Sequence, residues 1–418
     1  MRSDHWIKTK LSFLIDTISE TYKFRSDTKV VLINTSDILE GKVNNHLKIF
    51  PENVAGQFKK TFRKNDILYS EIRPDNKRYA YIDFESKNYV ASTKLMVLRK
   101  KNELVDNQFI YQLLKSNDTL SKLQVIAESR SGTFPQITFT ELSNLEINLP
   151  SLKEQKAIAS ILSSLDDKIE LNNKINKNLE EMAQALYKRW FVDFEFPNED
   201  GEPYKSSGGE MVESELGLIP KGWEVESIGE SSISKLISSG IKEFNGTKKY
   251  IATADVTNLS ITSFVTEIDF KKRPSRANMQ PIAGSLWFAK MKDSRKMIRV
   301  SKSSRYLIDK CILSTGFAGL FAPKYSNYIW TILTTKDFDD TKNNLCNGTT
   351  MQAINNENIN RIKILIPDTK TLDLFESISE PIFEKIQFNE MESNKLAKSR
   401  DELLPKLMNG EIEVPIEE

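Results

Sequence analysis

Short apolar runs bounded by turn residues recur along the first 150 residues and predict a strand-rich domain. Three such runs are residues 29–34, 66–70 and 94–98. Apolar runs of this length between turn signals are typical of buried strands. Residues 106–120 instead carry apolar side chains at helical spacing and predict one helix. Pro150 ends the last predicted strand, so the first domain is expected to cover residues 1–150.

The pattern then changes to that of one long helix over residues 151–196. This stretch contains neither Gly nor Pro. Ser151, followed three residues later by Glu154, forms a capping box that begins a helix. About 40 helical residues would measure about 60 Å at 1.5 Å per residue. A helix of that length needs a partner helix to cover its apolar face.

The pattern of the first half returns about 217 residues later. Trp6 and Trp223 open the two copies (223 − 6 = 217). A Gly-Thr pair recurs at 132–133 and at 348–349. Apolar runs matching those of the first half are residues 249–253, 285–289 and 362–366. The chain therefore contains two similar domains, each followed by a similar helix.

Each predicted long helix carries a row of apolar residues seven apart, with one asparagine at its centre. The first row is Ile158, Leu165, Asn172, Leu179 and Leu186, and the second is Phe375, Ile382, Asn389, Leu396 and Leu403. A polar residue in such a seam costs stability unless it is paired, but it fixes the register. We expect the helices to pair antiparallel, with Asn172 and Asn389 near each other. The alternative is two separate amphipathic helices, each packed on its own domain.

The positions of Gly and Pro predict the remaining domain boundaries. Residues 197–222 are rich in both and predict a linker. The second domain is expected at 223–367 and the C-terminal helical segment at 368–418, with Gly410 as a stop signal. Pro381 lies inside that helix and predicts a kink or a break there.

Composition places the chain among soluble globular proteins, with 39% hydrophobic and 28% charged residues. It contains no apolar run long enough for a bilayer and no signal-peptide pattern. Its two cysteines, Cys311 and Cys346, fit a reducing cytoplasm. The net charge is +1, from 59 basic and 58 acidic residues, so the total charge neither supports nor excludes a nucleic-acid partner.

Catalytic motifs are largely missing from the sequence. It contains no P-loop, no His-Glu-x-x-His motif, no nucleophile elbow and no cysteines at zinc-ligand spacing. Asp75, Glu85 and Lys87 fit the loose spacing of a magnesium-dependent nuclease. The second half has no equivalent, and a turn followed by a solvated strand explains the same residues.

Basic residues gather at matching places in the two domains and predict a DNA-binding face. In the first domain they are Arg73, Lys77 and Arg78 after one predicted strand, and Arg130 in a polar loop. In the second domain one cluster is Lys271, Lys272, Arg273 and Arg276, and the other is Lys290, Lys292, Arg295, Lys296 and Arg299. The second of these clusters follows the strand that matches the strand before Arg73.

Three stretches carry a resemblance to a known family. They are residues 149–159 (Leu-Pro-Ser-Leu-Lys-Glu-Gln-Lys-Ala-Ile-Ala), residues 197–217 beginning Pro-Asn-Glu-Asp-Gly, and residues 219–225 (Ile-Pro-Lys-Gly-Trp-Glu-Val). On these motifs the chain resembles the specificity subunits of type I restriction-modification enzymes over its whole length. The second copy diverges, because Thr371-Leu372 stands where the family has Glu-Gln.

The resemblance implies an α+β fold. Two mixed α/β target-recognition domains would be joined by two long helices that form an antiparallel coiled coil. Each domain would read one half of a gapped double-stranded DNA target, and the helices would set the gap and hold two modification (methyltransferase) subunits. Those partners would bring S-adenosylmethionine, and two restriction subunits, where present, would bring ATP and magnesium. This chain would contain no catalytic residue, cofactor or metal of its own. Two other hypotheses stay open at this point, namely a stand-alone magnesium nuclease and a coiled-coil adaptor that does not bind DNA.

Overall fold

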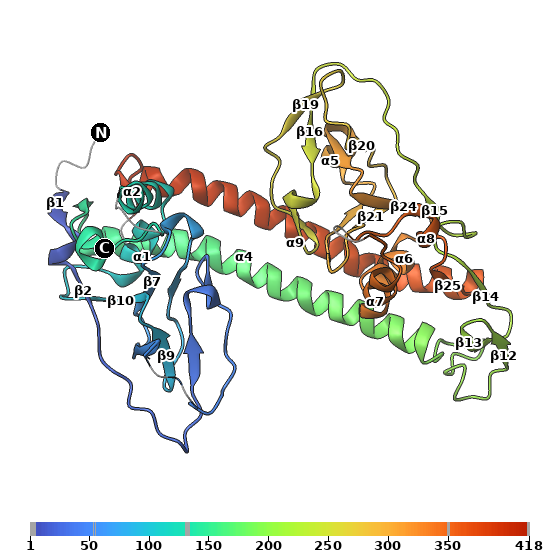
Figure 1. The fold of residues 1–418 in the computed structure, drawn as a ribbon, viewed down its shortest axis with the longest axis horizontal. Helices are drawn as coiled ribbons and strands as arrows, with labels where there is room; N and C mark the ends of the chain where they lie inside the picture. Colours follow the sequence, from blue (N-terminus) through green and yellow to red (C-terminus); the bar gives the residue numbers. More distant parts are fainter. Residues whose placement is uncertain (1–5, 53, 55, 130–133, 349–351, 416–418) are drawn as a thin grey trace. The chain divides into compact units, whose positions relative to one another are not determined.

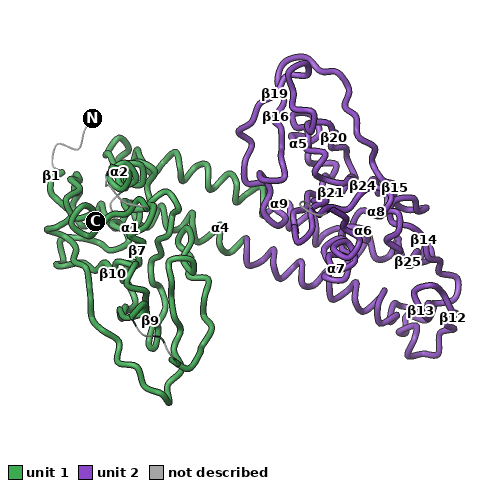
Figure 2. The backbone as a smooth tube through the Cα atoms, in the orientation of Figure 1, with its two compact units in different colours: residues 1–172, 390–418 green, residues 173–389 purple. Residues whose placement is uncertain are grey.

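A computed structural model describes residues 6–52, 54, 56–129, 134–348 and 352–415 of the chain. The chain divides into two compact units, and each takes part of both long helices (Figure 2). Unit 1 comprises residues 1–172 and 390–418, and unit 2 comprises residues 173–389. Domain 1 is used below for the strand-rich part of unit 1 up to residue 150, and domain 2 for residues 223–367.

Domain 1 is built on two sheets (Figure 1). The first is antiparallel, in the order β2 (Ile15–Thr17), β10 (Leu95–Lys100), β7 (Ile67–Ser70) and β8 (Tyr79–Tyr81). The second has the order β3 (Val31–Ile33), β9 (Tyr89–Ser92) and β6 (Phe58–Lys60), with β3 parallel to β9. Every residue of β7 is buried, which explains why this strand reads as an uninterrupted apolar run.

Domain 2 repeats this topology. Its first sheet has the order β15 (Lys235–Leu236), β24 (Phe317–Phe321), β21 (Ser285–Ala289) and β22 (Met297–Val300). Its second sheet has the order β19 (Glu267–Asp269), β16 (Thr247–Ile251), β23 (Cys311–Ser314) and β20 (Ala277–Met279), again with one parallel pair, β16 and β23. The two-domain repeat predicted from the sequence is confirmed at the level of strand order.

The smaller elements also recur in pairs. In domain 1 they are β1 (Ile7–Lys10) with β11 (Glu146–Leu149), β4 (Ile38–Leu39) with β5 (Lys42–Val43), and helices α1 (Asn107–Leu114), α2 (Asn117–Glu128) and α3 (Phe139–Ser143). In domain 2 they are β14 (Glu224–Ser227) with β25 (Lys363–Ile366), β17 (Val256–Thr257) with β18 (Ser260–Ile261), and helices α6 (Ser326–Leu333), α7 (Lys336–Asn344) and α8 (Asn356–Ile359). Domain 2 also contains the short helix α5 (Arg305–Lys310).

The prediction of a single helix over residues 106–120 is wrong, because the chain forms two helices there, α1 and α2, with a break between them. Ser116 adopts an extended backbone, and its hydroxyl accepts a hydrogen bond from the Thr119 amide at 3.2 Å. Serine favours this capping position over a helix interior, since its side chain replaces the missing backbone acceptor. A capping serine between two apolar stretches was the overlooked signal.

The long helices are α4 (Leu152–Tyr187), extended by a π-helical turn at Lys188–Val192, and α9 (Thr369–Met408). The predicted capping box at the start of α4 is confirmed: the Ser151 amide donates to Glu154 at 2.9 Å, and the Glu154 amide donates to the Ser151 hydroxyl at 3.3 Å. Within unit 1 the first part of α4 pairs with the last part of α9, as the Asp166–Arg400 ion pair at 2.9 Å shows. Within unit 2 the last part of α4 pairs with the first part of α9. Residue numbers rise along one helix as they fall along the other, so the pairing is antiparallel.

The predicted break at Pro381 does not occur, since α9 continues through this residue. Pro381 is exposed, and so is Ser377, whose carbonyl would have received the missing N–H. On the exposed face water can satisfy that carbonyl. The buried side chains of Phe375 and Phe383 hold the helix in its core on either side of the proline.

The predicted linker contains ordered structure. Strands β12 (Met211–Ser214) and β13 (Gly217–Pro220) form a hairpin, and the Phe196 ring stacks on Tyr204 and on Trp223. This segment packs into the core of unit 2 rather than running free. Among the described residues, no helix has the length and apolar character needed to cross a membrane.

Candidate nucleic-acid interface

Seven of the thirteen basic residues predicted to bind DNA lie in one kind of loop, which is found in each domain. In domain 1, residues 71–78 connect the antiparallel strands β7 and β8. In domain 2, residues 290–296 connect β21 and β22, the strands at the same places in the sheet. These two segments are called hairpin loop 1 and hairpin loop 2 below.

A second segment is hydrogen-bonded to each hairpin loop in the same way. In domain 1 the Arg73 amide donates to the Pro135 carbonyl at 3.0 Å, and the Ile137 amide donates to the Glu71 carbonyl at 2.8 Å. In domain 2 the corresponding bonds are Lys292 to Gln352 and Ile354 to Lys290, both at 2.9 Å. Both partner segments follow the repeated Gly-Thr pair, of which Gly132, Thr133 and Thr349 lie outside the described residues. The repeat seen in the sequence therefore builds two similar loop pairs.

Hairpin loop 1 uses most of its positive charge within domain 1. The Arg73 guanidinium lies over the Phe134 ring at 5.6 Å, and Lys77 pairs with Glu40 at 3.1 Å. The Arg78 guanidinium donates to two backbone carbonyls at 3.0 and 2.9 Å. Arg73 and Lys77 both have left-handed backbones, with φ of 45° and 53°, so the loop turns tightly on either side of Pro74.

Hairpin loop 2 holds Lys290 and Lys292 in different surroundings. The Lys290 ammonium donates to the Asn356 side chain at 3.2 Å, and burial lowers its pKa. Lys292 is exposed, and no carboxylate among the described residues pairs with it. Lys292 therefore presents the freest charge of this loop to a partner.

Two further cations of hairpin loop 2 contact domain 2 itself. Arg295 pairs with Asp339 at 3.6 Å and donates to a carbonyl of the α6–α7 connection. The Lys296 ammonium donates to the Thr253 carbonyl at 2.7 Å. Removing either side chain would therefore disturb the loop's own support as well as its charge.

Arg299 is not brought together with the other four residues of its predicted cluster. It lies on β22, where its guanidinium stacks over the Phe383 ring of α9 at 4.7 Å and donates to Asn327 of α6. Successive side chains of a strand point to opposite faces, and the Arg299 side chain lies on the face of β22 that packs on α9 rather than with the loop residues. Arg299 contributes to the packing of domain 2 on its helix.

The remaining predicted residues lie on the other sheet of domain 2, in the connection from β19 to β20. Lys271, Lys272 and Arg276 are exposed there, whereas the Arg273 guanidinium stacks over Phe270 at 4.2 Å. These residues form a basic cluster separate from hairpin loop 2. Arg130 lies outside the described residues.

Asn172 and Asn389 are each 1% exposed, and each bonds to the facing helix within its own unit. Asn172 donates to Glu392 at 2.8 Å and to Ser393 at 3.3 Å, and Asn389 donates to Asn176 at 2.7 Å. Because 176 + 217 = 393, the Asn172–Ser393 and Asn389–Asn176 contacts are the same contact in the two copies.

Sequence reasoning missed Asn176 and Ser393. Both belong to a second row seven apart, three or four residues from the first row. Its members on α4 and the π-helical turn that follows are Gln155, Leu162, Ile169, Asn176, Ala183 and Trp190, all wholly or partly buried. The alternating spacing of four and three was present in the sequence, but polar members of this row hid it.

Domain 2 is held on its long helix through a buried carboxylate. Glu376 of α9 accepts the backbone N–H of Tyr328 at 2.9 Å and that of Asn327 at 3.3 Å, so it caps the start of α6. Burial raises the pKa of Glu376 to about 7, against the two N–H groups and Arg299, which lower it. Neighbouring Glu380 also raises the pKa, and it accepts a bond from the Asn327 side chain at 2.7 Å.

Domain 1 is attached to its long helices differently, through a cluster of charged side chains that is called the ionic node below. Asp166 of α4 contacts Arg400 of α9 at 2.9 Å and also Lys115, the residue that follows α1. Burial would raise the pKa of Asp166, but Lys115 and Arg400 together hold it below its ordinary value. The node ties both helices to domain 1.

The two tryptophans that open the copies have matching roles. The Trp6 indole N–H donates to Glu154 of α4 at 3.3 Å, and the Trp223 indole N–H donates to Asp368, just before α9, also at 3.3 Å. Each domain is thereby bonded at its start to the beginning of the long helix that follows it.

The nuclease pattern does not assemble into a recognisable metal site. Asp75 lies in a 3-10 turn, and Glu85 and Lys87 are exposed residues beyond β8. Among the described residues, no group of three or more His, Cys, Asp or Glu side chains is placed to hold a metal ion.

Comparison with known proteins places these features in context. A family model described as the type I restriction modification DNA specificity domain matches residues 16–181. The HindI specificity subunit of Haemophilus influenzae is 32% identical, over 97% of this chain and 99% of that protein. The MjaIX specificity subunit of Methanocaldococcus jannaschii is 30% identical over 74% of this chain and 70% of its own length. The crystal structure of a type I restriction-modification S subunit from M. genitalium shares the fold, with a TM-score of 0.50 and 15% identity over 98% of this chain and 97% of that one.

Proposed function

Because the chain belongs to the family of type I restriction enzyme specificity subunits, we propose a division of labour between its two halves. The chain is the DNA sequence-specificity subunit of such an enzyme and is not itself catalytic. In our proposal, domain 1 reads one half of a gapped double-stranded target and domain 2 reads the other half. Membership of this family argues against a stand-alone nuclease and against an adaptor that does not bind DNA.

One observation carries this proposal. Two domains of the same strand order each present a basic hairpin loop. In each domain an equivalent segment is hydrogen-bonded to that loop. The loops differ in sequence, Glu71–Arg78 against Lys290–Lys296, so the two half-sites should differ. A loop of this size can enter the major groove, where base pairs present distinct donors and acceptors. The exposed cations of both domains would hold the backbone phosphates.

The paired helices would set the gap between half-sites and hold the modification subunits. Leu171 is 50% exposed and Phe388 is 58% exposed, although both are large and apolar. They occupy equivalent positions (388 − 171 = 217), each next to one of the central asparagines, Asn172 and Asn389. Two equivalent apolar positions support docking of two copies of one partner.

The cofactors would belong to the partners. Two modification subunits would bind S-adenosylmethionine and methylate adenine, and two restriction subunits, where the host has them, would bind ATP and magnesium. Such a complex would work in the cytoplasm, where the chromosome is. Free, unpaired Cys311 and Cys346 are consistent with that compartment.

The test is to sequence methylated bases across the host genome with and without this gene. Loss of one two-part, gapped, adenine-methylated motif is the expected result, and it would also reveal both half-sites. Methylation at a continuous motif, or an unchanged methylation pattern in a host that expresses the modification partner, would refute the proposal.

A further inference from the structure

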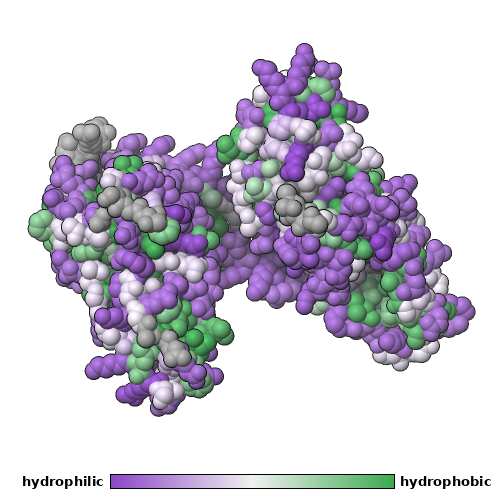
Figure 3. Space-filling view, viewed as in Figure 1, coloured by the Kyte–Doolittle hydropathy of each residue, from purple (hydrophilic) through white to green (hydrophobic). Residues whose placement is uncertain are grey.

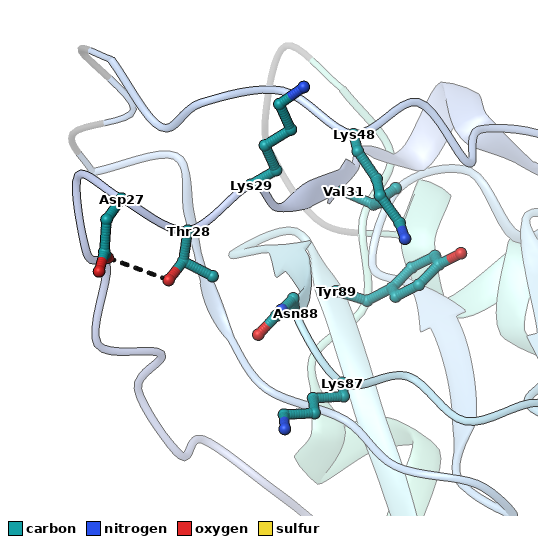
Figure 4. Close-up of a pocket in the computed structure, with 8 residues that line it drawn as sticks. All are labelled: Asp27, Thr28, Lys29, Val31, Lys48, Lys87, Asn88 and Tyr89. Carbon is teal, nitrogen blue, oxygen red and sulfur yellow. Dashed lines mark hydrogen bonds between the residues drawn. The ribbon is translucent and has the colours of Figure 1, made fainter.

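Domain 1 contains a polar pocket of about 330 Å³ at the amino ends of the parallel strands β3 and β9 (Figure 4). Lys29, Lys48 and Lys87 line it together with Asp27, Asn88 and Tyr89. The three lysines come from three separate segments and border the pocket on different sides (Figure 4). None of these residues belongs to hairpin loop 1.

The strands hold the walls of the pocket in place. The Val31 amide donates to the Asn88 carbonyl at 2.9 Å, which joins the two walls. The Asn88 side chain accepts from the Tyr22 hydroxyl at 3.0 Å, and the Tyr89 hydroxyl bonds His46 at 2.8 Å. The Tyr89 ring also packs on Phe84, with centroids 5.0 Å apart. The lysines therefore extend from an ordered base.

The lining of the pocket carries more positive than negative charge. It includes three lysines and one carboxylate, that of Asp27, which accepts a hydrogen bond from the Thr28 hydroxyl at 3.1 Å. Among the described residues, no carboxylate forms an ion pair with Lys29, Lys48 or Lys87. Lys29 lies over the Phe50 ring at 5.1 Å, which orients its side chain without neutralising it. The surface of unit 1 near β9 mixes such apolar groups with hydrophilic ones (Figure 3).

Hairpin loop 1 differs in this respect. There Lys77 pairs with Glu40, and Arg78 donates to backbone carbonyls. Domain 1 therefore keeps in the pocket three lysines that form no ion pair among the described residues, of which Lys29 contacts the Phe50 ring. A lysine ammonium carries three N–H donors and binds phosphate as a point charge.

Domain 2 differs from this arrangement at a matching position. Tyr89 and Cys311 take the same place in the two parallel strand pairs, opposite Val31 and Lys249 respectively. Two residues earlier, domain 1 has Lys87 and domain 2 has Asp309. The shared fold therefore does not require a lysine at the position of Lys87.

We propose that this pocket binds a backbone phosphate of the DNA, beside the bases that domain 1 reads. The inference rests on the proposed function, since it takes the DNA target as the source of the phosphate. Val31 lies within about 17 Å of Ser36, whose carbonyl Arg78 contacts, because five extended residues span about 3.3 Å each. One helical turn of DNA spans about 34 Å, so a single duplex can reach both places. The phosphate contact would add affinity without adding sequence information.

The experiment compares three full-length proteins on a labelled duplex with the methylated motif. They are the wild type, the triple variant K29A/K48A/K87A, and the control K8A/K10A/K122A, which removes three exposed lysines elsewhere in domain 1. The pocket variant should bind at least about tenfold more weakly at 0.15 M salt. Its plot of log affinity against log salt should be less steep by about one, the value for one lost phosphate contact. Its preference for the motif over an unrelated duplex should be unchanged, and the control should match the wild type.

A further variant and a footprint separate the outcomes. The triple arginine variant keeps the charge and should restore most of the binding. Acetylation of Lys29, Lys48 and Lys87, followed by mass spectrometry, should slow with the duplex but not with inorganic phosphate at the same phosphate concentration. Equal binding of the pocket and control variants would overturn the pocket, as would protection by inorganic phosphate alone. A wild type with no preference for the motif would instead overturn the proposed function.

Discussion

At the scale of single residues, basic side chains divide into those that the fold uses and those that it leaves to solvent. Arg78, Lys296 and Arg299 donate to acceptors of their own domain, whereas Lys292 and Lys271 are exposed. Sequence clustering cannot separate these groups, because the acceptors come from distant segments such as Thr253. Whether any of these residues contacts DNA stays a prediction.

Glu376 gives a pH-dependent prediction at this scale. Its pKa is raised by burial from 4.5 to about 7. Between these values the folded protein binds more protons than the unfolded chain, so the free energy of unfolding falls as pH rises through this window. Each pKa unit corresponds to about 1.4 kcal/mol, which sets an upper limit of about 3.5 kcal/mol. Chemical denaturation from pH 5 to 8 should show this decline in the wild type and not in E376Q.

The matched control for that measurement is E384Q, which changes an exposed glutamate on the same helix. It should follow the wild-type pH profile. Parallel profiles for the wild type and E376Q would show that Glu376 does not titrate between pH 5 and 8 in the folded protein.

At the scale of elements, the seam between α4 and α9 depends on polar contacts as well as apolar ones. The sequence predicted that Asn172 and Asn389 would fix its register. The structure shows their hydrogen-bond partners to include Ser393 and Asn176. A test of register must therefore replace contacting pairs, not the two central asparagines together.

The prediction concerns the buried pair Asn176 and Asn389. N389L should lower the free energy of unfolding by about 1–3 kcal/mol, because it leaves the Asn176 amide oxygen buried without its donor. The double variant N176L/N389L should be more stable than N389L alone. Denaturation of the single and double variants measures the coupling. Exposed Asn173→Leu is the control, and additive losses in the double variant would argue against the pair.

At the scale of the whole molecule, the chain contains the same domain fold twice, and the long helices connect the two copies. Strand order, loop pairing and the Trp6 and Trp223 contacts all recur. Charge does not recur in the same way, since the lysine pocket belongs to domain 1 and the Lys271 cluster to domain 2. Two domains with the same fold and different surface charges are suited to reading two different half-sites.

The proposed role of the helices predicts the result of a length change. Duplicating the heptads 169–175 in α4 and 386–392 in α9 keeps both apolar rows in phase. Seven residues add about 10.5 Å along a helix, or about three base pairs at 3.4 Å each. Methylation sequencing should then find the same half-sites with a gap longer by about three base pairs. An unchanged gap, or altered half-sites, would count against this role, and duplication in one helix alone should reduce stability.

The family was indicated by the resemblance of three motifs, at residues 149–159, 197–217 and 219–225. The sequence by itself also determined the two-fold repeat and the long helices, and it predicted their antiparallel pairing. These follow from local periodicity and from spacing, which a linear chain displays directly. The repeated tryptophans, Trp6 and Trp223, and the capping box at Ser151 were visible in the sequence in the same way. The break between α1 and α2 was missed, because the Ser116 cap outweighs the helix propensity of its neighbours. The predicted break at Pro381 was wrong, because the proline lies on the exposed face and the buried Phe375 and Phe383 hold α9 on either side of it.

Only the tertiary structure decided which charges are available. Lys29, Lys48 and Lys87 are far apart in sequence and form one pocket because β3 and β9 run parallel. Arg299 left its predicted cluster because alternation along β22 turns it toward α9. Asp166 gained its role from Lys115 and Arg400, which lie 51 and 234 residues away. Such contacts depend on the closure of long loops, whose partners no local pattern specifies.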